Sequence, residues 1–521
     1  MSASIFYFGK DHLTVSIAME LARGKRKGVL HDETIRSIGE SADIVADIVA
    51  SEEVVYGINT GFGPLCNTRI SKEDTRILQD NILRSHAVGV GNFLTKELSK
   101  LMLILKVHSL AKGYSGVSLA LIERIIWHLE KDLIPCVPEQ GSVGASGDLA
   151  PLAHLFLPLI NLGQVWQEEQ VTNASEVLHG LGKQPQTLGP KEGLALINGT
   201  QFIAAHATMV VERLYNCLGH ADLIGAMMIE ALMGSIKPFR VELHQVRPFT
   251  ANLHVAERIY HLLEDSEILQ SHQDCDRVQD PYSLRCIPQV HGTSRTAWLH
   301  LKELVETELN AVTDNPIIIH RELTISGGNF HGQPLALPLD YAALAASELG
   351  NISDRRIYLA LEGLGGLPKL LMKDTGINSG FMLCQYTSAA LVSENKSLVY
   401  PASADSIPTS LGQEDHVSMG SISGRKALRI IDNLEKILAI ELLCAAQAFD
   451  FRRPLKSGPI LEACHAAIRQ HIDHADEDRV FSEDINQALK IIISRELTHI
   501  VSSKDQFPQF NTAYYEQYEI Y

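Results

Sequence analysis

The chain has 521 residues, of which 45% are hydrophobic and 21% charged, so it can bury a large core and is neither disordered nor a small disulfide-stapled scaffold. Acidic residues (62) outnumber lysines and arginines (45), and the formal net charge of −17 argues against nucleic acid or an anionic membrane as the main partner. The eight cysteines form no Cys-x-x-Cys pair, which favours reduced, buried thiols in a cytoplasmic protein. The N-terminus lacks a signal-peptide pattern, and prolines interrupt the most apolar stretch, 149–162, so no membrane span is expected.

In chain order, glycine-rich loops are predicted at 57–64 and 139–148, with a helical pattern between them at 98–129. Further helices are predicted at 202–233, 341–360 and 425–449. The apolar stripe of the second of these comprises Tyr341, Leu344, Ala345, Leu349 and Ile352. Long helices with apolar seams predict a mainly α bundle with faces left for other subunits. A shift in composition divides the chain into a mixed, loop-rich region, 1–195, and a helical-bundle region, 196–521.

Several common catalytic motifs are missing from the sequence. There is no phosphate-binding Gly-x-x-x-x-Gly-Lys-Ser/Thr loop and no His-Glu-x-x-His zinc helix. Ser146 is not a nucleophile elbow, because Asp148 stands where the second glycine would be needed. A group near the C-terminus could bind a metal, but we interpret it as a solvated, acidic helix end, and no metal site is expected. That group is His465, His471, His474 and Asp476.

The tripeptide Ala145-Ser146-Gly147 carries the chemistry. With its neighbours, Gly144 to His154, it resembles the cofactor segment of the aromatic amino-acid ammonia-lyase family. The resemblance implies that the tripeptide cyclises into a 4-methylidene-imidazol-5-one (MIO), with no external organic cofactor. Attack of the Gly147 nitrogen on the Ala145 carbonyl needs a contorted backbone that glycine permits, and loss of water from Ser146 leaves an electrophilic methylene. The alternative is a glycine-rich turn that enters a helix near Asp148.

Other blocks between about residues 50 and 450 follow the family's order. They are 55–63, 194–200, 279–289, 313–316 and 327–332. The resemblance implies a long-helix bundle of the fumarase/aspartase-like type, with the MIO carried by the loop-rich N-terminal region. It also implies a homotetramer whose active sites are shared among subunits.

Two tyrosines are candidate catalytic residues by this resemblance. Tyr56 is the candidate base for the β-proton of the substrate. Because a phenol normally titrates near ~10, its surroundings must favour the deprotonated form, for which the positive end of a helix would serve. Tyr282 is expected to support the MIO ring or the proton transfer. The alternative for Tyr56 is a buried tyrosine beside a turn.

Besides His86, whose segment is described below, four residues are candidates for binding the substrate. Arg285 would hold its carboxylate as a two-point fork, unless it is a surface charge. Asn198 and Gln279 are neutral hydrogen-bond partners for the amine and the carboxylate. Phe330 packs near the substrate or serves the core.

Two segments indicate which amino acid is bound. Ser85 to Gly91, with His86, resembles the version of the selectivity segment found in histidine lyases. Glu414 lies where those enzymes place a glutamate against the imidazole, whose N–H a carboxylate accepts well, whereas a benzene ring would leave it unpaired. Glu414 is also a candidate for exchanging a proton with the ring. Leu411-Gly412 replaces the more common Ala-Asn, which puts the geometry of this loop in question.

The expected activity is the non-oxidative conversion of L-histidine to trans-urocanate and ammonia, the first step of histidine breakdown. A tyrosine or phenylalanine lyase or aminomutase using the same electrophile is the nearest alternative. A catalytically inactive relative of the same fold is a second. The fumarase and argininosuccinate-lyase group is disfavoured, because its Ser-Ser-x-Met-Pro-x-Lys-x-Asn loop is absent.

Overall fold

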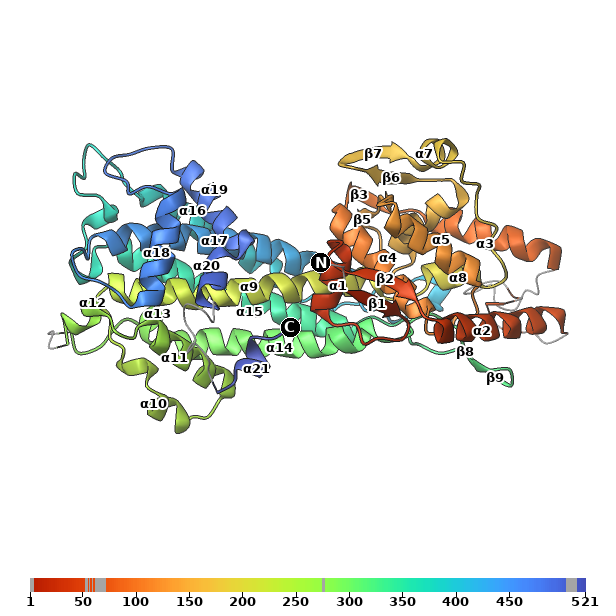
Figure 1. The fold of residues 1–521 in the computed structure, drawn as a ribbon, viewed down its shortest axis with the longest axis horizontal. Helices are drawn as coiled ribbons and strands as arrows, with labels where there is room; N and C mark the ends of the chain where they lie inside the picture. Colours follow the sequence, from red (N-terminus) through yellow and green to blue (C-terminus); the bar gives the residue numbers. More distant parts are fainter. Residues whose placement is uncertain are drawn as a thin grey trace. The chain divides into compact units, whose positions relative to one another are not determined.

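A computed structural model describes most of the chain and shows a mainly helical protein (Figure 1). The described residues are 4–51, 55, 57–58, 60, 72–273, 277–502 and 513–521. They divide into two compact units, each built from three separate stretches. Unit 1 comprises Met1–Met209, Leu301–Asp340 and Pro401–Arg425; unit 2 comprises Val210–His300, Tyr341–Tyr400 and Lys426–Tyr521.

Unit 1 combines helices with four small sheets. Its helices are α1 (Val15–Ala22), α2 (Asp32–Ala50), α3 (Lys72–His86), α4 (Lys96–Leu110), α5 (Leu119–Glu130), α6 (Leu149–Phe156), α7 (Ala174–Gly180) and α8 (Glu192–Ile197). Strand β1 (Ile5–Phe8) pairs in parallel with β2 (Lys27–Leu30), with Ile5 opposite Lys27. The antiparallel pairs are β3 (Val90–Phe93) with β5 (Pro138–Gln140), β4 (Ile134–Pro135) with β6 (Gln164–Gln167), β6 with β7 (Gln170–Asn173), and β8 (Ile317–His320) with β9 (Leu323–Ile325).

The core of unit 1 is built around α4, which is buried on every side from Leu98 to Leu110. It packs against α1, α5 and α6, and α6 in turn packs against α3 and α8. A helix that is apolar on all faces is stable only where neighbours cover every face. This central position explains why a charged residue of α4, Lys106, is buried as well.

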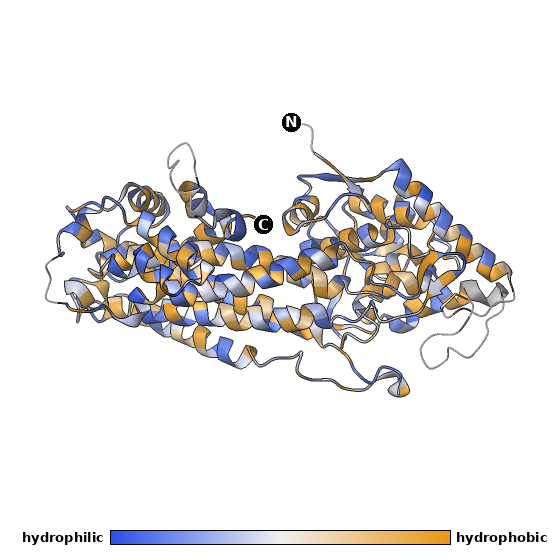
Figure 2. Cartoon of the chain, turned by 90° about the horizontal axis from the view of Figure 1, so that it is seen from below, coloured by the Kyte–Doolittle hydropathy of each residue, from blue (hydrophilic) through white to orange (hydrophobic). Residues whose placement is uncertain are grey.

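Unit 2 consists of helices. Those that lie wholly within it are α10 (Val241–Gln245), α11 (Thr250–Leu262), α12 (Glu267–Gln270), α13 (Tyr282–Arg285), α16 (Met382–Leu398), α18 (Pro459–His471), α19 (Phe481–Ser494), α20 (Glu496–Val501) and α21 (Tyr515–Tyr518). The unit boundaries fall inside α9 (Gln201–Ala231), α14 (Ile287–Leu309), α15 (Gln333–Leu361) and α17 (Gly420–Asp450). Apolar and polar residues are interleaved along the long helices (Figure 2), as expected for amphipathic elements.

The long helices predicted from the sequence are present, with different bounds at two places. The pattern at 98–129 is two helices, α4 and α5, because Gly113 has φ +79° and Ser118 caps the second. The stripe predicted along 341–360 is buried at Ala345, Leu349 and Ile352 but is 53% exposed at Leu344. That helix therefore presents apolar residues on two sides.

The compact units are not the two contiguous regions, 1–195 and 196–521, that composition suggested. Leu301–Asp340 and Pro401–Arg425 also belong to unit 1. They contact its first stretch, and such contacts cannot be read from composition. Lys191 forms an ion pair with Asp314 at 2.9 Å, and the backbone N–H of Met419 donates to the Val143 carbonyl. Among the described residues, no helix has both the length and the apolar character needed to cross a membrane.

Candidate active site

The tripeptide lies in the loop that precedes α6, with a backbone that L-residues rarely adopt. Ser146 has φ +53° and Gly147 has φ +81°. A Cβ on Gly147 would lie 2.2 Å from the carbonyl oxygen of Gly199, so only glycine fits there. The backbone N–H of Asp148 donates to the same Gly199 carbonyl at 2.8 Å. The segment around Gly199 thus holds the tripeptide in its contorted form.

Asp148 ties this loop to the start of α9. Its buried carboxyl accepts hydrogen bonds from the backbone N–H of Ile203 at 3.0 Å and from Ser142 Oγ at 3.3 Å. Burial raises the pKa of Asp148 to about 7, although these hydrogen bonds oppose the shift. Because Ile203 is in the first turn of α9, the carboxyl also provides an acceptor for the unpaired N–H groups at that helix end.

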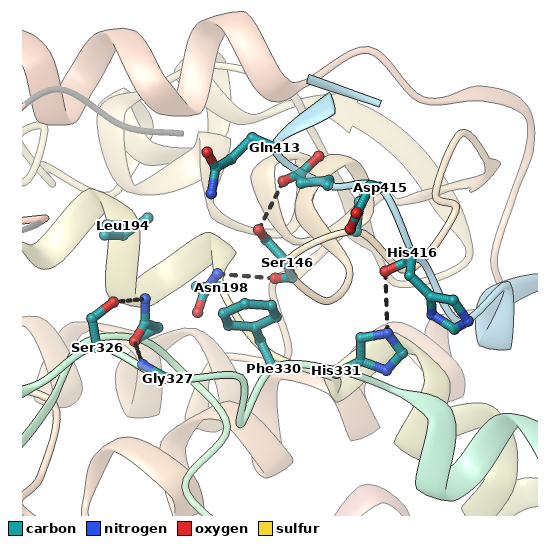
Figure 3. Close-up of a pocket in the computed structure, with 13 residues that line it drawn as sticks. Ser146, Leu194, Asn198, Ser326, Gly327, Phe330, His331, Gln413, Asp415 and His416 are labelled. Atoms are coloured by element: carbon teal, nitrogen blue, oxygen red, sulfur yellow. Dashed lines mark hydrogen bonds between the residues drawn. The ribbon is translucent and has the colours of Figure 1, made fainter. Parts of the chain in front are cut away.

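A cavity of about 390 Å³ opens over the tripeptide, and all its lining residues belong to unit 1. They are Ala145, Ser146, Leu194, Asn198, Asn315, Ser326, Gly327, Phe330, His331, Gln413, Glu414, Asp415 and His416. Ser146 Oγ donates to Glu414 Oε1 at 2.8 Å, and Asn198 Nδ2 donates to the Ser146 carbonyl at 2.9 Å (Figure 3). Asn198 Oδ1 is buried and has no hydrogen-bond partner among the described residues.

Aromatic side chains form another wall of the cavity. Figure 3 shows Phe330 and His331 turned toward it from the 327–332 loop. The rings of His331 and His416 stack with centroids 5.7 Å apart, and His331 Nε2 lies 3.3 Å from the His416 carbonyl oxygen. The cavity therefore combines two carboxylates, Glu414 and Asp415, and amide side chains with flat rings, an arrangement suited to a small polar aromatic molecule.

A buried lysine supports the asparagine. Lys106 Nζ donates to the carbonyl oxygens of Asn198 at 2.7 Å and Ala195 at 3.0 Å. Burial lowers the pKa of Lys106 to about 7. These hydrogen bonds fix the backbone of the residue whose side chain binds Ser146.

Three other predicted residues form a separate cluster in unit 2. Arg285 donates from Nε to the Asp280 carbonyl at 3.0 Å and from Nη2 to Gln279 Oε1 at 3.0 Å. Its guanidinium lies over the ring of Tyr282, 4.5 Å from the centroid. Tyr282 itself is 71% exposed.

Comparison with known proteins gives one consistent result. A sequence model of the family described as "Aromatic amino acid lyase" matches residues 13–470. The chain is 46% identical over 471 residues to a histidine ammonia-lyase of Natranaerobius thermophilus, covering 90% of this chain and 93% of that protein. The chain belongs to the aromatic amino acid lyase family.

Solved structures show the same fold. A histidine ammonia-lyase from Trypanosoma cruzi superposes with a TM-score of 0.88 at 39% identity, covering 98% of each chain. A tyrosine aminomutase from Streptomyces globisporus superposes with a TM-score of 0.89 at 33% identity, covering 94% of this chain and 97% of that one. The predictions of a mainly α fold and of a lyase are confirmed.

The structure of this lyase brings some predicted site residues together and leaves others apart. The cavity contains Ala145, Ser146, Asn198, Phe330 and Glu414, with Gly147 directly below. A second group, Gln279, Tyr282 and Arg285, forms the cluster in unit 2. Tyr56 lies outside the described residues, although Gly57 contacts Leu194 in the cavity wall.

His86, the last residue of α3, is not among the described residues that line the cavity. Burial lowers its pKa, and the nearby negative charge of Glu414 opposes that shift.

Sequence reasoning missed several residues of the site. Gln413, Asp415, His331 and His416 line the cavity and Lys106 lies behind it, but no role was assigned to any of them. His331 stands in the 327–332 block and the other three lie within two residues of Glu414, so their polar character near recognised residues was an available signal. Nothing in the sequence distinguishes Lys106 from the other lysines.

Of the four C-terminal residues, only His471 lies outside a cluster around Asp450. His465 Nε2 lies 2.9 Å from Asp450 Oδ1, and His474 Nδ1 and Arg469 Nη2 lie 2.7 and 2.6 Å from Asp450 Oδ2. His474 Nε2 lies 3.9 Å from Asp476, whereas His471 pairs with Glu496 at 3.2 Å. Within the described ranges there is no group of three or more potential ligands that could hold a metal ion. An arginine on the shared carboxylate makes this an ion-pair cluster.

Proposed function

We propose that this lyase converts L-histidine to trans-urocanate and ammonia. The observation that carries the proposal is the position of Glu414, whose Oε1 lies 2.8 Å from Ser146 Oγ inside the cavity. A carboxylate there would accept the N–H of an imidazole, whereas a phenyl ring would leave it desolvated and unpaired. Relatives named histidine ammonia-lyase, at 44–47% identity, support the same substrate.

The residues around the tripeptide fit formation of the MIO that characterises the family. The backbone at Ser146 and Gly147 has the left-handed conformation of a tight turn, and only glycine fits at position 147. The Asn198 amide would stabilise the Ser146 carbonyl oxygen through its hydrogen bond. When formed, the MIO supplies an electrophilic methylene that no unmodified side chain offers.

Residues of the cavity would bind the substrate as follows. Glu414 would orient the imidazole and exchange a proton with it, and Asn198 Oδ1, a buried acceptor without a described partner, would accept an N–H of the amine. Phe330 would cover the bound ring and exclude water. His86, whose pKa is lowered by burial and which interacts electrostatically with Glu414, would contribute to selectivity.

Other groups would act at the opposite end of the substrate. Tyr56 would take the β-proton, Arg285 and Gln279 would bind the carboxylate, and Tyr282 would support proton transfer. Tyr282 and Arg285 lie at the surface of unit 2, next to each other. We propose that they complete the active site of another copy of the chain in a homotetramer.

Exposed apolar side chains on two helices of unit 2 support this assembly. Leu344 on α15 is 53% exposed, and Leu383 and Tyr386 on α16 are 55% and 60% exposed. Neighbouring exposed apolar residues of this size are typical of surfaces that other chains cover. The finer classification as a fumarase/aspartase-like bundle agrees with such long helices. The six described cysteines are all free and five are buried, which supports a cytoplasmic location.

Urocanate formation tests the proposal directly. Purified protein should convert L-histidine, but not L-tyrosine or L-phenylalanine, to a product that absorbs in the near ultraviolet. Ser146→Ala, which cannot form the methylene, should be inactive and should lack the mass loss of two waters, roughly 36 Da, of the wild type. Formation of coumarate or cinnamate would instead favour the tyrosine or phenylalanine alternative, for which the likeness to a tyrosine aminomutase is the supporting observation.

A further inference from the structure

Glu414 is held by one of its two carboxylate oxygens. Its Oε2 accepts hydrogen bonds from Thr409 Oγ1 at 2.9 Å and from Ser410 Oγ at 2.8 Å. Its Oε1 accepts only the Ser146 hydroxyl among the described contacts, at 2.8 Å. The backbone N–H of Thr409 also donates to the Glu414 carbonyl at 3.0 Å, so the two residues face each other across a β-bridge.

The backbone of this loop is strained in a way that supports the contact. Ser410, Leu411 and Gly412 have φ values of +50°, +56° and +85°, and the Gly412 N–H closes a turn onto the Thr409 carbonyl at 3.0 Å. Positive φ at both central residues normally calls for Asn or Gly, not Ser-Leu. Leu411 is 96% exposed, so burial of its side chain does not compensate for the strain. The turn does place the Ser410 hydroxyl on the carboxylate.

We propose that Thr409 and Ser410 are positioning residues that orient Glu414 for the imidazole. The proposal rests on the histidine lyase function proposed above. Two donors on one oxygen make the two ends of the carboxylate unequal, so Oε2 is fixed and Oε1 faces the substrate. Cyclisation removes the Ser146 hydroxyl, after which Oε1 has the substrate N–H to accept.

Several other titratable groups lie near Glu414 or line the same cavity. His86 interacts with it electrostatically from the end of α3, while Asp415 and His416 flank it in the loop and His331 faces the same cavity. The Thr409 and Ser410 variants alter none of these four residues. Any change in KM or in substrate preference then comes from the two hydroxyls.

The experiment compares Thr409→Val, Ser410→Ala and the double variant with the wild-type enzyme. The KM for L-histidine should rise by about tenfold or more in the double variant, because both hydrogen bonds to the Oε2 of the Glu414 carboxylate are lost. The preference for histidine over tyrosine should fall. Thr409→Ser keeps a hydroxyl and should retain most of the affinity.

Ser406→Ala is the matched control. Ser406 Oγ accepts from the Val417 N–H at 2.9 Å in the same loop and makes no described contact with Glu414. This variant should leave the KM and the substrate preference unchanged, and intact mass should show the same loss of two waters in every variant. If the double variant keeps the wild-type KM and substrate preference, the positioning role is wrong. If the wild type itself forms no urocanate, the proposed function fails first, and the role of the two hydroxyls fails with it.

Discussion

Lys106 and Asp148 are two buried ionisable residues that hold neighbouring parts of one segment. The ammonium group binds the Asn198 carbonyl, and the carboxyl accepts the N–H of Ile203 five residues later. Burial disfavours the charged form of each, so the pKa of both moves to about 7. No apolar residue could donate to the carbonyls or accept from the helix end. Burying these two groups costs free energy, but their hydrogen bonds fix the position of Asn198 and of the tripeptide that Asn198 contacts.

Substitution of Lys106 by methionine should reveal this cost through its dependence on pH. The pKa in the folded protein is about 7, below the ordinary value of 10.5, so between these pH values the unfolded chain binds more protons. The wild type therefore gains stability as pH rises from 7 to 9, whereas Lys106→Met does not. The variant also leaves two buried carbonyls without donors, and at pH 9 it should be about 1–3 kcal/mol less stable.

Urea unfolding at pH 7, 8 and 9, at one protein concentration, measures both effects. Lys27→Met is the control, because that side chain is 61% exposed and pairs with Glu130 at the surface. Lys106→Met should also lower kcat through misplacement of Asn198. A free-energy difference from the wild type that is the same at all three pH values would contradict a buried, titrating lysine.

At the scale of elements, the 409–414 loop shows how a strained turn can be kept for the sake of one contact. A left-handed conformation costs an ordinary L-residue about 1–2 kcal/mol. Leu411→Asn should relieve part of this strain, because Asn tolerates positive φ and the leucine side chain is exposed. Thermal or urea unfolding should show a gain of about 1 kcal/mol, with kcat unchanged.

Gly412→Ala provides the opposite result at the next position. Its φ of +85° is unfavourable for alanine even though no atom lies within 4 Å of a Cβ there. That variant should lose about 1 kcal/mol of stability. Equal stability of the two variants would mean that the turn does not hold these φ values in solution.

How much of these elements could be predicted depends on how local their causes are. The helices at 202–233 and 425–449 match α9 and α17 closely, because periodicity and the lack of breakers are local properties. Helix α15 begins at Gln333, earlier than predicted, because it includes Pro338, which sequence rules treat as a breaker. The turn at Ser410-Leu411 was not predictable, since its residues contradict turn preferences. Only the hydrogen bond from the Ser410 hydroxyl to the Glu414 carboxylate explains it.

The same distinction between local patterns and contacts decides which residues of the site could be predicted. Ser146, Asn198 and Glu414 stand in blocks recognisable by family resemblance, and the cavity brings all three together. Departure from the usual Ala-Asn at Leu411-Gly412 left the loop geometry in question, yet glycine, like asparagine, accepts the positive φ that position 412 needs. Lys106 stands in no recognised block, and its role arises from tertiary contacts that the sequence does not display. Thr409 and Ser410 lie in the same loop as Glu414, but the sequence does not show that their hydroxyls bind its carboxylate.

At the scale of the whole molecule, the candidate residues fall into two groups on different units of the chain. The cavity group, with Ser146 and Glu414, belongs to unit 1, and the group with Tyr282 and Arg285 belongs to unit 2. Exposure of Tyr282 and of apolar side chains on α15 and α16 indicates surface that another copy could cover. In a closed symmetric oligomer, one chain can supply the electrophile and its neighbour the carboxylate clamp.

Mixing two inactive variants tests whether sites are shared in this way. Ser146→Ala removes the residue from which the proposed electrophile forms and Arg285→Ala removes the proposed carboxylate clamp, so each variant on its own should have almost no activity. When the two chains are co-expressed in equal amounts, a site is complete if its cavity comes from an Arg285→Ala chain and its clamp from a Ser146→Ala chain. Each condition holds for half of the positions, so random assembly should restore about a quarter of wild-type activity. Mixed oligomers that stay as inactive as their parents would place both groups of a working site on one chain. Leu344→Glu, which puts a charge on the exposed face of α15, should abolish the recovery by preventing assembly, and light scattering should show the smaller species.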